Sequence, residues 1–151
     1  MGMGQADPPH RFAIYHDQGK MKYESRWWSL ELPSGWFGYA DGPCSTFTNA
    51  AHDGVLQVSA AYKDIGQVTD DDLKEFASER ISSHSPLDVV ISEGFSGITI
   101  RYQREGRWWQ EWWLRSDHLM VYLTYNASVM SENTEHDAIS SIISSLKAQT
   151  S

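Results

Sequence analysis

The chain has 151 residues and a mass of 17.2 kDa, the length of one ordinary domain and enough to bury about two-thirds of the unfolded surface. Twenty acidic residues against twelve lysines and arginines give a net charge of −8. That charge argues against nucleic acid and against an anionic membrane surface as partners, because both attract proteins through lysine and arginine.

Cys44 is the single cysteine, so the chain forms no intrachain disulfide and no cysteine-based zinc site. We expect its side chain to be a small buried apolar group. No apolar run approaches the roughly 20 residues of a membrane-spanning helix, and the first twenty residues lack the apolar core of a signal peptide. These features predict a cytoplasmic protein without membrane insertion, unless a leader was removed.

The N-terminal part of the chain alternates short extended segments with turns. Residues 1–10 contain glycine and proline, which predicts a flexible segment ahead of a single domain at residues 11–151. Strands are expected at residues 12–16, 23–32, 44–48 and 55–62. The last of these has apolar residues at alternate positions, with Leu56 and Val58 on the side predicted to face the core.

Two helices are predicted. Thr69 and Asp72 have the spacing of a capping box, in which each side chain bonds the backbone N–H of the other, so a helix is expected over residues 69–81. Its apolar residues recur at helical spacing: Leu73, Phe76, Ala77 and Ile81. The second helix is expected over about residues 132–147. Its apolar stripe consists of Ile139, Ile142, Ile143 and Leu146.

Four extended segments lie between the helices, at about residues 88–93, 97–103, 107–115 and 118–126. The third overlaps the sequence GRWWQEWWLR at residues 106–115, in which four tryptophans fall within six residues. Such a cluster is either a binding surface or a core strand with large side chains. The neighbouring strands therefore have to show which way each tryptophan faces.

The strand after the tryptophans indicates which of them face a core. Its apolar residues stand at alternate positions: Leu119, Val121, Leu123 and Tyr125. A two-residue turn at residues 116–117 sets Leu114 opposite Leu119 and Trp112 opposite Val121. Trp108 shares the face of Trp112, so both are predicted to lie in the core.

The turn before the tryptophans decides the face of the preceding strand. A three-residue loop at residues 104–106, with Gly106 in the left-handed conformation, pairs Ile98 with Trp112. A two-residue loop at residues 105–106 instead places Ile98 and Ile100 on the opposite face, because a slip of one residue inverts a strand. The three-residue loop is favoured here, since it gathers every large aliphatic side chain on one side.

This pairing leaves an outer face that is unusually aromatic for a surface in contact with water. The candidate binding residues on it are Trp109, Trp113, Tyr122, Met120, Glu111, Arg101 and Arg115. Three explanations stay open. A helix or the N-terminal segment covers this face; or it binds a partner protein, since Trp, Tyr, Met and Arg are enriched at interfaces; or it forms a small-molecule pocket with Glu111 as the polar group.

A series of segments carries a family resemblance over about residues 24–148. The segments are LPSGW (32–36), GVLQVSAAY (54–62), TDDDLKEFASERI (69–81), GITIRY (97–102), WWLRSDHLMVYLTYNAS (112–128) and AISSIISSLK (138–147). In this order they resemble the PsbP-like superfamily, which includes PsbP, the Ran-binding Mog proteins, and bacterial DcrB and Eag-type domains. The resemblance implies an α+β fold, with helices packed on the faces of an antiparallel sheet as an α/β/α sandwich. It also implies a non-enzymatic role in binding proteins.

Patterns that would indicate catalysis or metal binding are not found in the sequence. The acidic residues at 64 and 70–72 lack the spacing of a calcium loop, and acidic residues in the first turn of a helix are explained by its dipole. The six histidines form neither HxH nor HExxH, and residues 94–97 are not the GxSxG motif. We therefore expect no catalytic residue, no metal site and no cofactor.

Together these features predict a non-enzymatic protein-binding module of a bacterial cytoplasm, for example an effector chaperone or an immunity-like protein. The alternative is a small-molecule-binding protein or small enzyme that uses the outer aromatic face. The sequence predicts neither the identity of the partner nor the oligomeric state.

Overall fold

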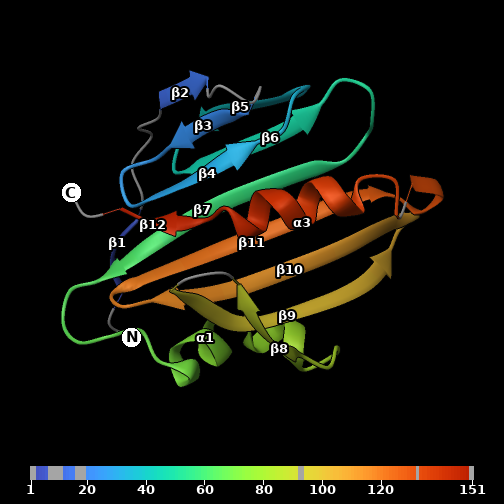
Figure 1. Cartoon of the computed structure of the whole chain (residues 1–151). Helices are drawn as coiled ribbons and strands as arrows, with labels where there is room; N and C mark the ends of the chain where they lie inside the picture. Colours follow the sequence, from blue (N-terminus) through green and yellow to red (C-terminus); the bar gives the residue numbers. More distant parts are fainter. Residues whose placement is uncertain (1–2, 7–11, 16–19, 92–93, 132, 150–151) are drawn as a thin grey trace.

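The computed structural model describes residues 3–6, 12–15, 20–91, 94–131 and 133–149, which form two antiparallel sheets and a few short helices (Figure 1). The larger sheet has, in spatial order, β5 (Trp36–Asp41), β6 (Cys44–Asn49), β7 (Val55–Lys63), β11 (Leu119–Ser128), β10 (Arg107–Ser116), β9 (Phe95–Arg104) and β8 (Leu87–Ile91), and β1 (Met3–Ala6) also pairs with β7. The smaller sheet has the order β12 (Lys147–Ala148), β4 (Trp28–Leu32), β3 (Met21–Glu24) and β2 (Phe12–Tyr15).

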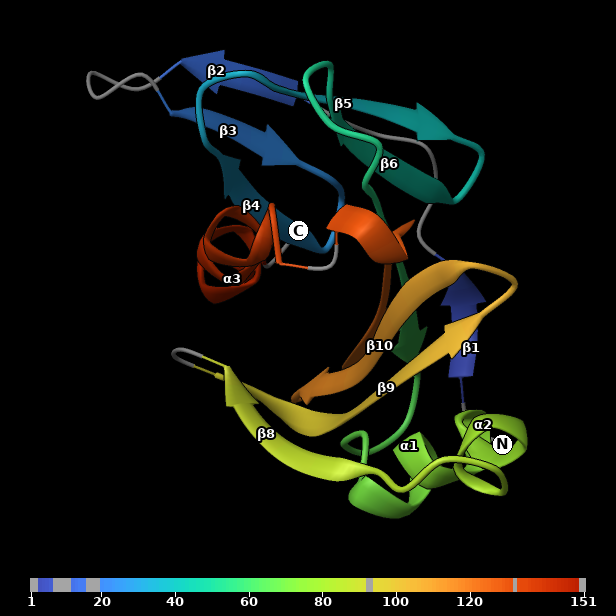
Figure 2. The ribbon, with the colours of Figure 1, turned by 90° about the vertical axis from the view of Figure 1, so that its right-hand side faces the viewer.

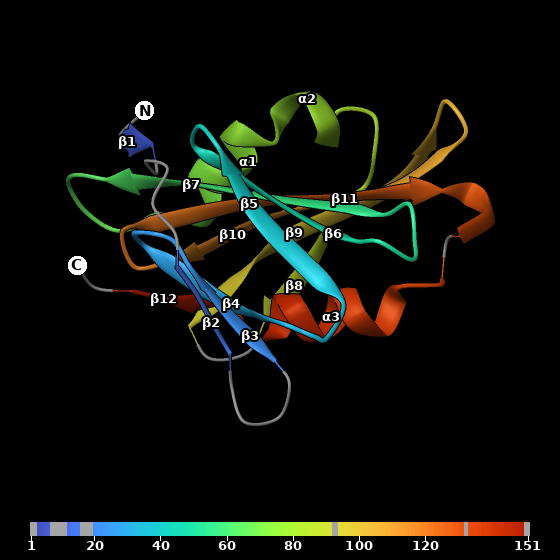
Figure 3. The ribbon, with the colours of Figure 1, turned by 90° about the horizontal axis from the view of Figure 1, so that it is seen from above.

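The larger sheet is curved, and its two faces are covered by different elements (Figure 2). The inner face packs against the smaller sheet and α3 (His136–Ser144), which follows the short 3-10 helix η1 (Val129–Ser131). The outer face carries α1 (Asp70–Phe76) and α2 (Ser78–Ile81). In the view from above, α3 lies on one side of the sheet and the two shorter helices lie on the other (Figure 3).

The main core lies between the inner face and the elements that cover it. Its fully buried side chains include Trp28, Leu30, Phe47, Leu56, Leu114, Val121, Leu123 and Ile142. Trp112 is also buried there, and Trp108 packs against this core while half-buried. Burial of each large apolar side chain contributes about 1.5–3 kcal/mol. The prediction that Trp108 and Trp112 face the core is confirmed.

A second, smaller core lies on the outer face, beneath α1. It consists of Val68, Leu73, Ala77, Ile98, Ile100, Trp113 and Met120. Leu73 and Ala77 lie on the side of α1 predicted to be apolar, but Phe76 is 43% exposed. This core provides the first of the three explanations offered for the outer tryptophans, since α1 covers one of them.

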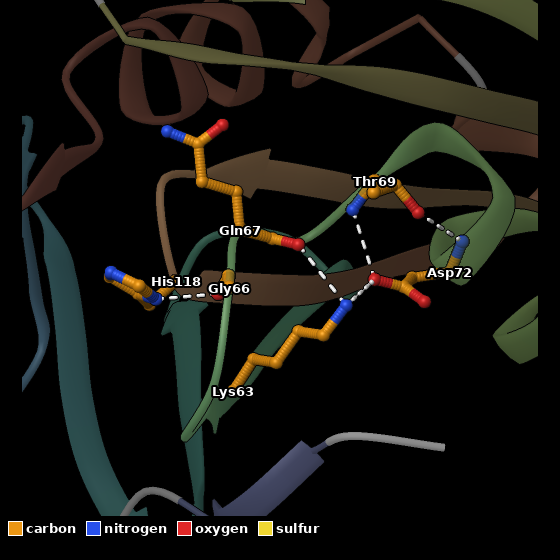
Figure 4. Close-up of polar contacts among 6 residues, drawn as sticks. All are labelled: Lys63, Gly66, Gln67, Thr69, Asp72 and His118. Carbon is orange, nitrogen blue, oxygen red and sulfur yellow. Dashed lines mark hydrogen bonds and ion pairs between the residues drawn. The ribbon is translucent and has the colours of Figure 1, made fainter.

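The start of α1 is held by the capping box (Figure 4). Asp72 N donates to Thr69 Oγ1 at 3.1 Å, and Thr69 N donates to Asp72 Oδ2 at 3.0 Å. Lys63 Nζ at the end of β7 donates to the same carboxylate at 2.7 Å, and His118 Nδ1 lies 2.6 Å from the Gly66 carbonyl oxygen. The predicted cap is therefore confirmed, and Lys63 ties it to the end of β7, while His118 contacts the loop that leads to α1.

The β9–β10 hairpin differs from the prediction. Its loop has two residues, Glu105 and Gly106, both with positive φ (53° and 77°), and Ile98 pairs with Trp113 instead of Trp112. Ile98 and Ile100 consequently face outward. The prediction was wrong because it assumed a single core, whereas this sheet buries apolar side chains on both faces.

The β10–β11 turn is also displaced, without a change of face. Ser116 pairs with Leu119 and Trp112 pairs with Leu123, so the turn residues are Asp117 and His118 in place of residues 116–117. The register shift is two residues. Because side chains alternate with a period of two, every side chain of β11 keeps its predicted face.

We expect Glu105→Asn to raise the free energy of unfolding by about 0.5–1 kcal/mol. Glu105 adopts the left-handed conformation, which asparagine accepts more readily, and Asn-Gly is the favoured pair in such two-residue hairpins. Urea unfolding measures the effect. Glu105→Gln removes the same charge without this backbone preference and is the control, so an equal gain from Gln would assign the effect to charge.

Other element boundaries were only partly anticipated. The strand predicted at residues 23–32 is broken at residues 25–27 into β3 and β4, β5 was not predicted, and α3 is shorter than the predicted helix. Of the segment predicted to be flexible, residues 3–6 form β1, while residues 1–2 and 7–10 lie outside the described residues. The single domain at residues 11–151 stays a prediction.

The predicted antiparallel α+β architecture is confirmed, but the α/β/α sandwich is confirmed only in part. The layer that contains α3 also contains the smaller sheet, so the protein is richer in strands than a sandwich of helices around one sheet. No helix in the described ranges is long and apolar enough to cross a membrane.

Candidate functional site

A carboxylate is buried in the outer face of the larger sheet. Glu111 on β10 is 1% exposed. Arg80 Nε donates to its Oε2 at 3.0 Å, and Tyr102 OH donates to the same oxygen at 2.7 Å. Tyr122 OH donates to Oε1. A buried carboxylate costs several kcal/mol unless it is paired and hydrogen-bonded, and here one guanidinium and two phenols offset that cost.

Three strands and a helix bring these groups together. Tyr102 on β9 and Tyr122 on β11 flank β10 from either side, and each is a diagonal neighbour of Glu111 on the same face. Arg80 reaches the carboxylate from α2. The position of α2 follows from that of α1, whose first turn is held by the capping box.

Burial and the hydrogen bonds to Glu111 keep both phenols protonated. Burial, and then the hydrogen bond to Glu111, raises the pKa of Tyr102 to about 12. The same two causes raise the pKa of Tyr122 well above its ordinary value. Both side chains therefore act as neutral donors at physiological pH.

Stability is expected to fall as the pH rises from about 10, the ordinary pKa of tyrosine, to about 12. Over this range the unfolded chain releases the two phenolic protons while the folded chain retains them. The unfolded state is therefore stabilised relative to the folded state, and the free energy of unfolding falls. Urea midpoints measured at about pH 9 and about pH 11 test this. In a Tyr102→Phe/Tyr122→Phe variant the dependence is expected to be flatter; an unchanged slope would contradict the assignment.

Three hollows adjoin one another beside Glu111. A cleft of about 400 Å³ separates the α1–α2 segment from β7 and β11, and its lining includes Ala60, Ala61, Phe76, Arg80, Trp113, Met120 and Tyr122. A hollow of about 190 Å³ at the hairpin end is lined by Arg80, Tyr102, Arg104, Glu105, Arg107, Trp109, Glu111, Tyr122 and Thr124. A third, of about 220 Å³, is lined by Cys44, Gln57, Ser59, Trp109, Tyr122 and Thr124.

Tyr122 lines all three hollows, so we treat them as one surface and call it the outer groove. Phe37 and Tyr39 on β5 are 58% and 50% exposed, and strand pairing puts Tyr39 in one cross-strand row with Glu111. Exposed aromatic side chains thus flank the groove on the side away from the helices.

The predicted binding residues are distributed unequally. Trp113 and Met120 are 4% and 6% exposed, beneath α1. Trp109 and Tyr122 are half-buried and line the outer groove, with Glu111 at its base. The two aromatic side chains therefore remain accessible, whereas Trp113 and Met120 belong mainly to the second core.

Two predicted residues lie away from the outer groove. Arg115 Nε donates to Asp70 Oδ1 at 2.8 Å and ties β10 to α1. Arg101 lies on the inner side of β9, with its guanidinium carbon 4.6 Å from the centre of the Trp108 ring. The assignment of Arg101 to the outer face is wrong, because it depended on the three-residue loop.

Three residues of the outer groove were not predicted from the sequence: Arg80, Tyr102 and Arg104. Arg80 lies within the predicted helix, and its proximity to Glu111 is not encoded in any local pattern. Tyr102 and Arg104 face the groove because the loop of the hairpin has two residues. The alternative loop considered from the sequence would have found both.

Cys44 is half-buried, and burial is the main cause that raises the pKa of its thiol. It lies at the edge of the groove with its side chain un-ionised, which partly agrees with the expected buried apolar role. Within the described ranges, no group of three or more His, Cys, Asp or Glu side chains is placed to hold a metal ion.

A separate hollow of about 460 Å³ lies at the β10–β11 turn, between Arg26, Tyr62, His118 and Gln149. The Tyr62 ring stands 5.6 Å from both the Trp27 and the His118 rings. Trp27 is only 5% exposed, and the polar lining comes mainly from turns and chain ends. The outer groove is the stronger candidate because it combines accessible aromatic side chains with a buried, fully bonded carboxylate.

No family model and no curated protein matches the sequence. Solved structures do match. A protein of Bacteroides thetaiotaomicron has a TM-score of 0.61 and 18% identity over 82% of this chain, which spans 46% of that protein. LpqN of Mycobacterium tuberculosis, described as involved in cell envelope biogenesis, has a TM-score of 0.57 and 12% identity over 97% of this chain and 93% of its own. Cyanobacterial PsbP from Synechocystis has a TM-score of 0.49 and 14% identity, over 99% of this chain and 96% of its own.

All of these identities are below 25%, so the likeness concerns the fold alone. It assigns no subfamily, substrate or partner. The strands and helices follow the order that the resemblance of the sequence implied. The chain shares its fold with the Bacteroides protein and with LpqN.

Proposed function

We propose that this protein is a non-enzymatic protein-binding module that receives a segment of a partner protein in the outer groove. The observation that carries the proposal is the incomplete cover of the outer face. α1 buries Trp113, yet Trp109 and Tyr122 remain half-buried, and Phe76, which lines one cleft with Tyr122, is 43% exposed. Aromatic side chains next to an arginine, here Arg80, are the usual composition of the energetic centre of an interface.

A non-enzymatic role agrees with the chemistry of the groove. Both oxygens of Glu111 accept hydrogen bonds from protein donors, so this carboxylate is poorly suited to take a proton from a substrate. The thiol of Cys44 is un-ionised, which makes it a weak nucleophile. For the compartment we keep the prediction from the sequence, a bacterial cytoplasm.

A small-molecule-binding role is the second candidate. One observation favours it: the cleft of about 400 Å³ beside Phe76 and Met120 falls within the usual size range of ligand pockets. A metabolite bound there would lie against Trp113 and change its fluorescence. A saturable change with a metabolite, abolished in Phe76→Ala, would favour this role over the first.

Site-specific photo-crosslinking in the native host's lysate tests the protein-binding role. A crosslinking amino acid at Gln57, in the groove, is compared with one at Glu75, an exposed position on α1. A discrete adduct is expected from position 57 alone, and Trp109→Ala is expected to reduce it. Adducts of equal yield from both positions, or none from position 57, would contradict the proposal.

A further inference from the structure

The hairpin end of the outer groove gathers positive charge in an acidic protein. Arg80, Arg104 and Arg107 line the hollow of about 190 Å³, although the chain has only twelve lysines and arginines and a net charge of −8. The acidic groups in the same lining are Glu105 and Glu111. Three cations therefore face two acids in the lining of this hollow.

Two of these arginines oppose each other across the hairpin. Arg104 on β9 pairs with Arg107 on β10, and like charges placed directly opposite destabilise a strand pair. Arg107 is compensated, since its Nε donates to Asn126 Oδ1 at 2.6 Å and its guanidinium contacts Asp53. The side chain of Arg104 makes no hydrogen bond or ion pair with any residue in the described part of the chain.

Arg80 is also left with free donors. Its Nε bonds Glu111, but its terminal amino groups have no acceptor among the described residues, and its side chain is 41% exposed. Glu111 already accepts bonds from Arg80, Tyr102 and Tyr122. The hollow thus offers guanidinium N–H groups of Arg80 and Arg104 to a ligand, and guanidinium groups bind carboxylates in a bidentate geometry.

Apolar surface lies at a defined distance along the same groove. Trp109 lines the charged hollow and Trp113 lines the cleft beside Met120 and Phe76. The two tryptophans are four residues apart on one strand, which corresponds to roughly 13 Å. An extended peptide covers that distance with about four residues of its own.

We propose that the groove recognises an extended acidic segment of the partner. The carboxylate of an aspartate or glutamate side chain binds Arg80 and Arg104, and an apolar side chain about four residues away fills the cleft beside Trp113 and Met120. This inference rests on the proposed protein-binding function and specifies the chemistry of the partner.

Selection from random peptides of about twelve residues, displayed with both ends blocked, supplies the probe. We expect the selected peptides to share an acidic residue at a constant spacing from an apolar one. Affinities are then measured for one selected peptide and for its Asp→Asn or Glu→Gln form, each against the original protein and against Arg104→Gln. Arg104 is exposed, so its replacement is expected to leave the fold intact.

Each single change is expected to weaken binding about tenfold, the usual size of a charge-assisted hydrogen bond. The two changes together are expected to weaken it little further, because both remove the same contact. Arg101→Gln is the matched control. It removes an equal charge from the same strand but on the inner face, beside Trp108, and is expected to leave the affinity unchanged.

The outcomes separate the inference from the function on which it rests. If selected peptides bind the groove, lose affinity in Trp109→Ala, but show no acidic preference or no response to Arg104→Gln, the inference is overturned and the protein-binding role stands. If no selected peptide depends on Trp109, the protein-binding role itself is overturned. Equal losses in Arg101→Gln and Arg104→Gln would indicate a general effect of charge and would also overturn the inference.

Discussion

Trp113→Ala is expected to lower the free energy of unfolding by about 4 kcal/mol, as large-to-small changes at buried tryptophans do. Trp113 is 4% exposed and lies in the second core with Leu73, Ile98 and Met120. Its removal leaves a cavity that α1 cannot fill, because the start of the helix is held by its cap. A domain of this kind has a total stability of about 5–15 kcal/mol, so the loss is severe. Equilibrium unfolding in urea measures it.

Trp109→Ala is the matched comparison, since it removes the same side chain from the same face of the same strand. Trp109 is half-buried and lines the outer groove, so we expect a loss of about 1 kcal/mol. Its main effect is expected on binding. An equally large loss from Trp109→Ala would show that Trp109 is a core residue, and the outer groove would then not be a free surface.

Glu111→Ala is expected to lower the free energy of unfolding by about 3 kcal/mol. The change removes the acceptor from the half-buried Tyr102 and Tyr122, and a buried donor without a partner costs about 1–3 kcal/mol, of which the lower part applies to these two. Loss of the contact with Arg80 lowers the stability less, because this side chain is 41% exposed and water replaces part of the lost contact. Urea unfolding again measures the effect.

Two further variants delimit this prediction. Glu111→Gln keeps an acceptor oxygen in nearly the same place and is expected to cost less than Glu111→Ala. Glu105→Ala removes an exposed acid from the adjacent hairpin turn and is expected to change stability by less than about 0.5 kcal/mol, apart from the effect of its backbone conformation. If Glu111→Ala were neutral, the hydrogen bonds around this carboxylate would contribute nothing to stability, and the prediction would be wrong.

The two larger predictions bear on function because they distinguish the part of the outer face that is buried under α1 from the part that remains accessible to a partner. α1 completes a second core over part of the outer face. Tyr122 packs at the edge of this core, whereas Trp109 is not among the described residues that form it or pack against it. Glu111 lies at that boundary, bonded to α2 through Arg80 and to both neighbouring strands through the two phenols. A folded, rigid boundary of this kind preorganises the groove, which lowers the cost of binding a flexible segment.

Local patterns in the sequence determined most of the secondary structure. The capping box at Thr69 and the alternation of β11 were read correctly, since both depend on residues a few positions apart. The core face of Trp112 followed from that alternation and survived a register error of two residues. The spacing of residues along the chain was enough to predict these features, because helix caps and strand periodicity arise within single elements.

Only the tertiary structure decided which groups meet on the outer face. Both loop lengths of the β9–β10 hairpin fit the local sequence, and they differ in whether Ile98, Tyr102 and Arg104 face inward or outward. The choice depends on α1, which supplies a second core for Ile98 and Ile100. Arg80 reaches Glu111 from α2, 31 residues earlier in the chain. The sequence by itself therefore determined the elements and one core face, whereas the groove and its charged end follow from long-range packing, which no local periodicity records.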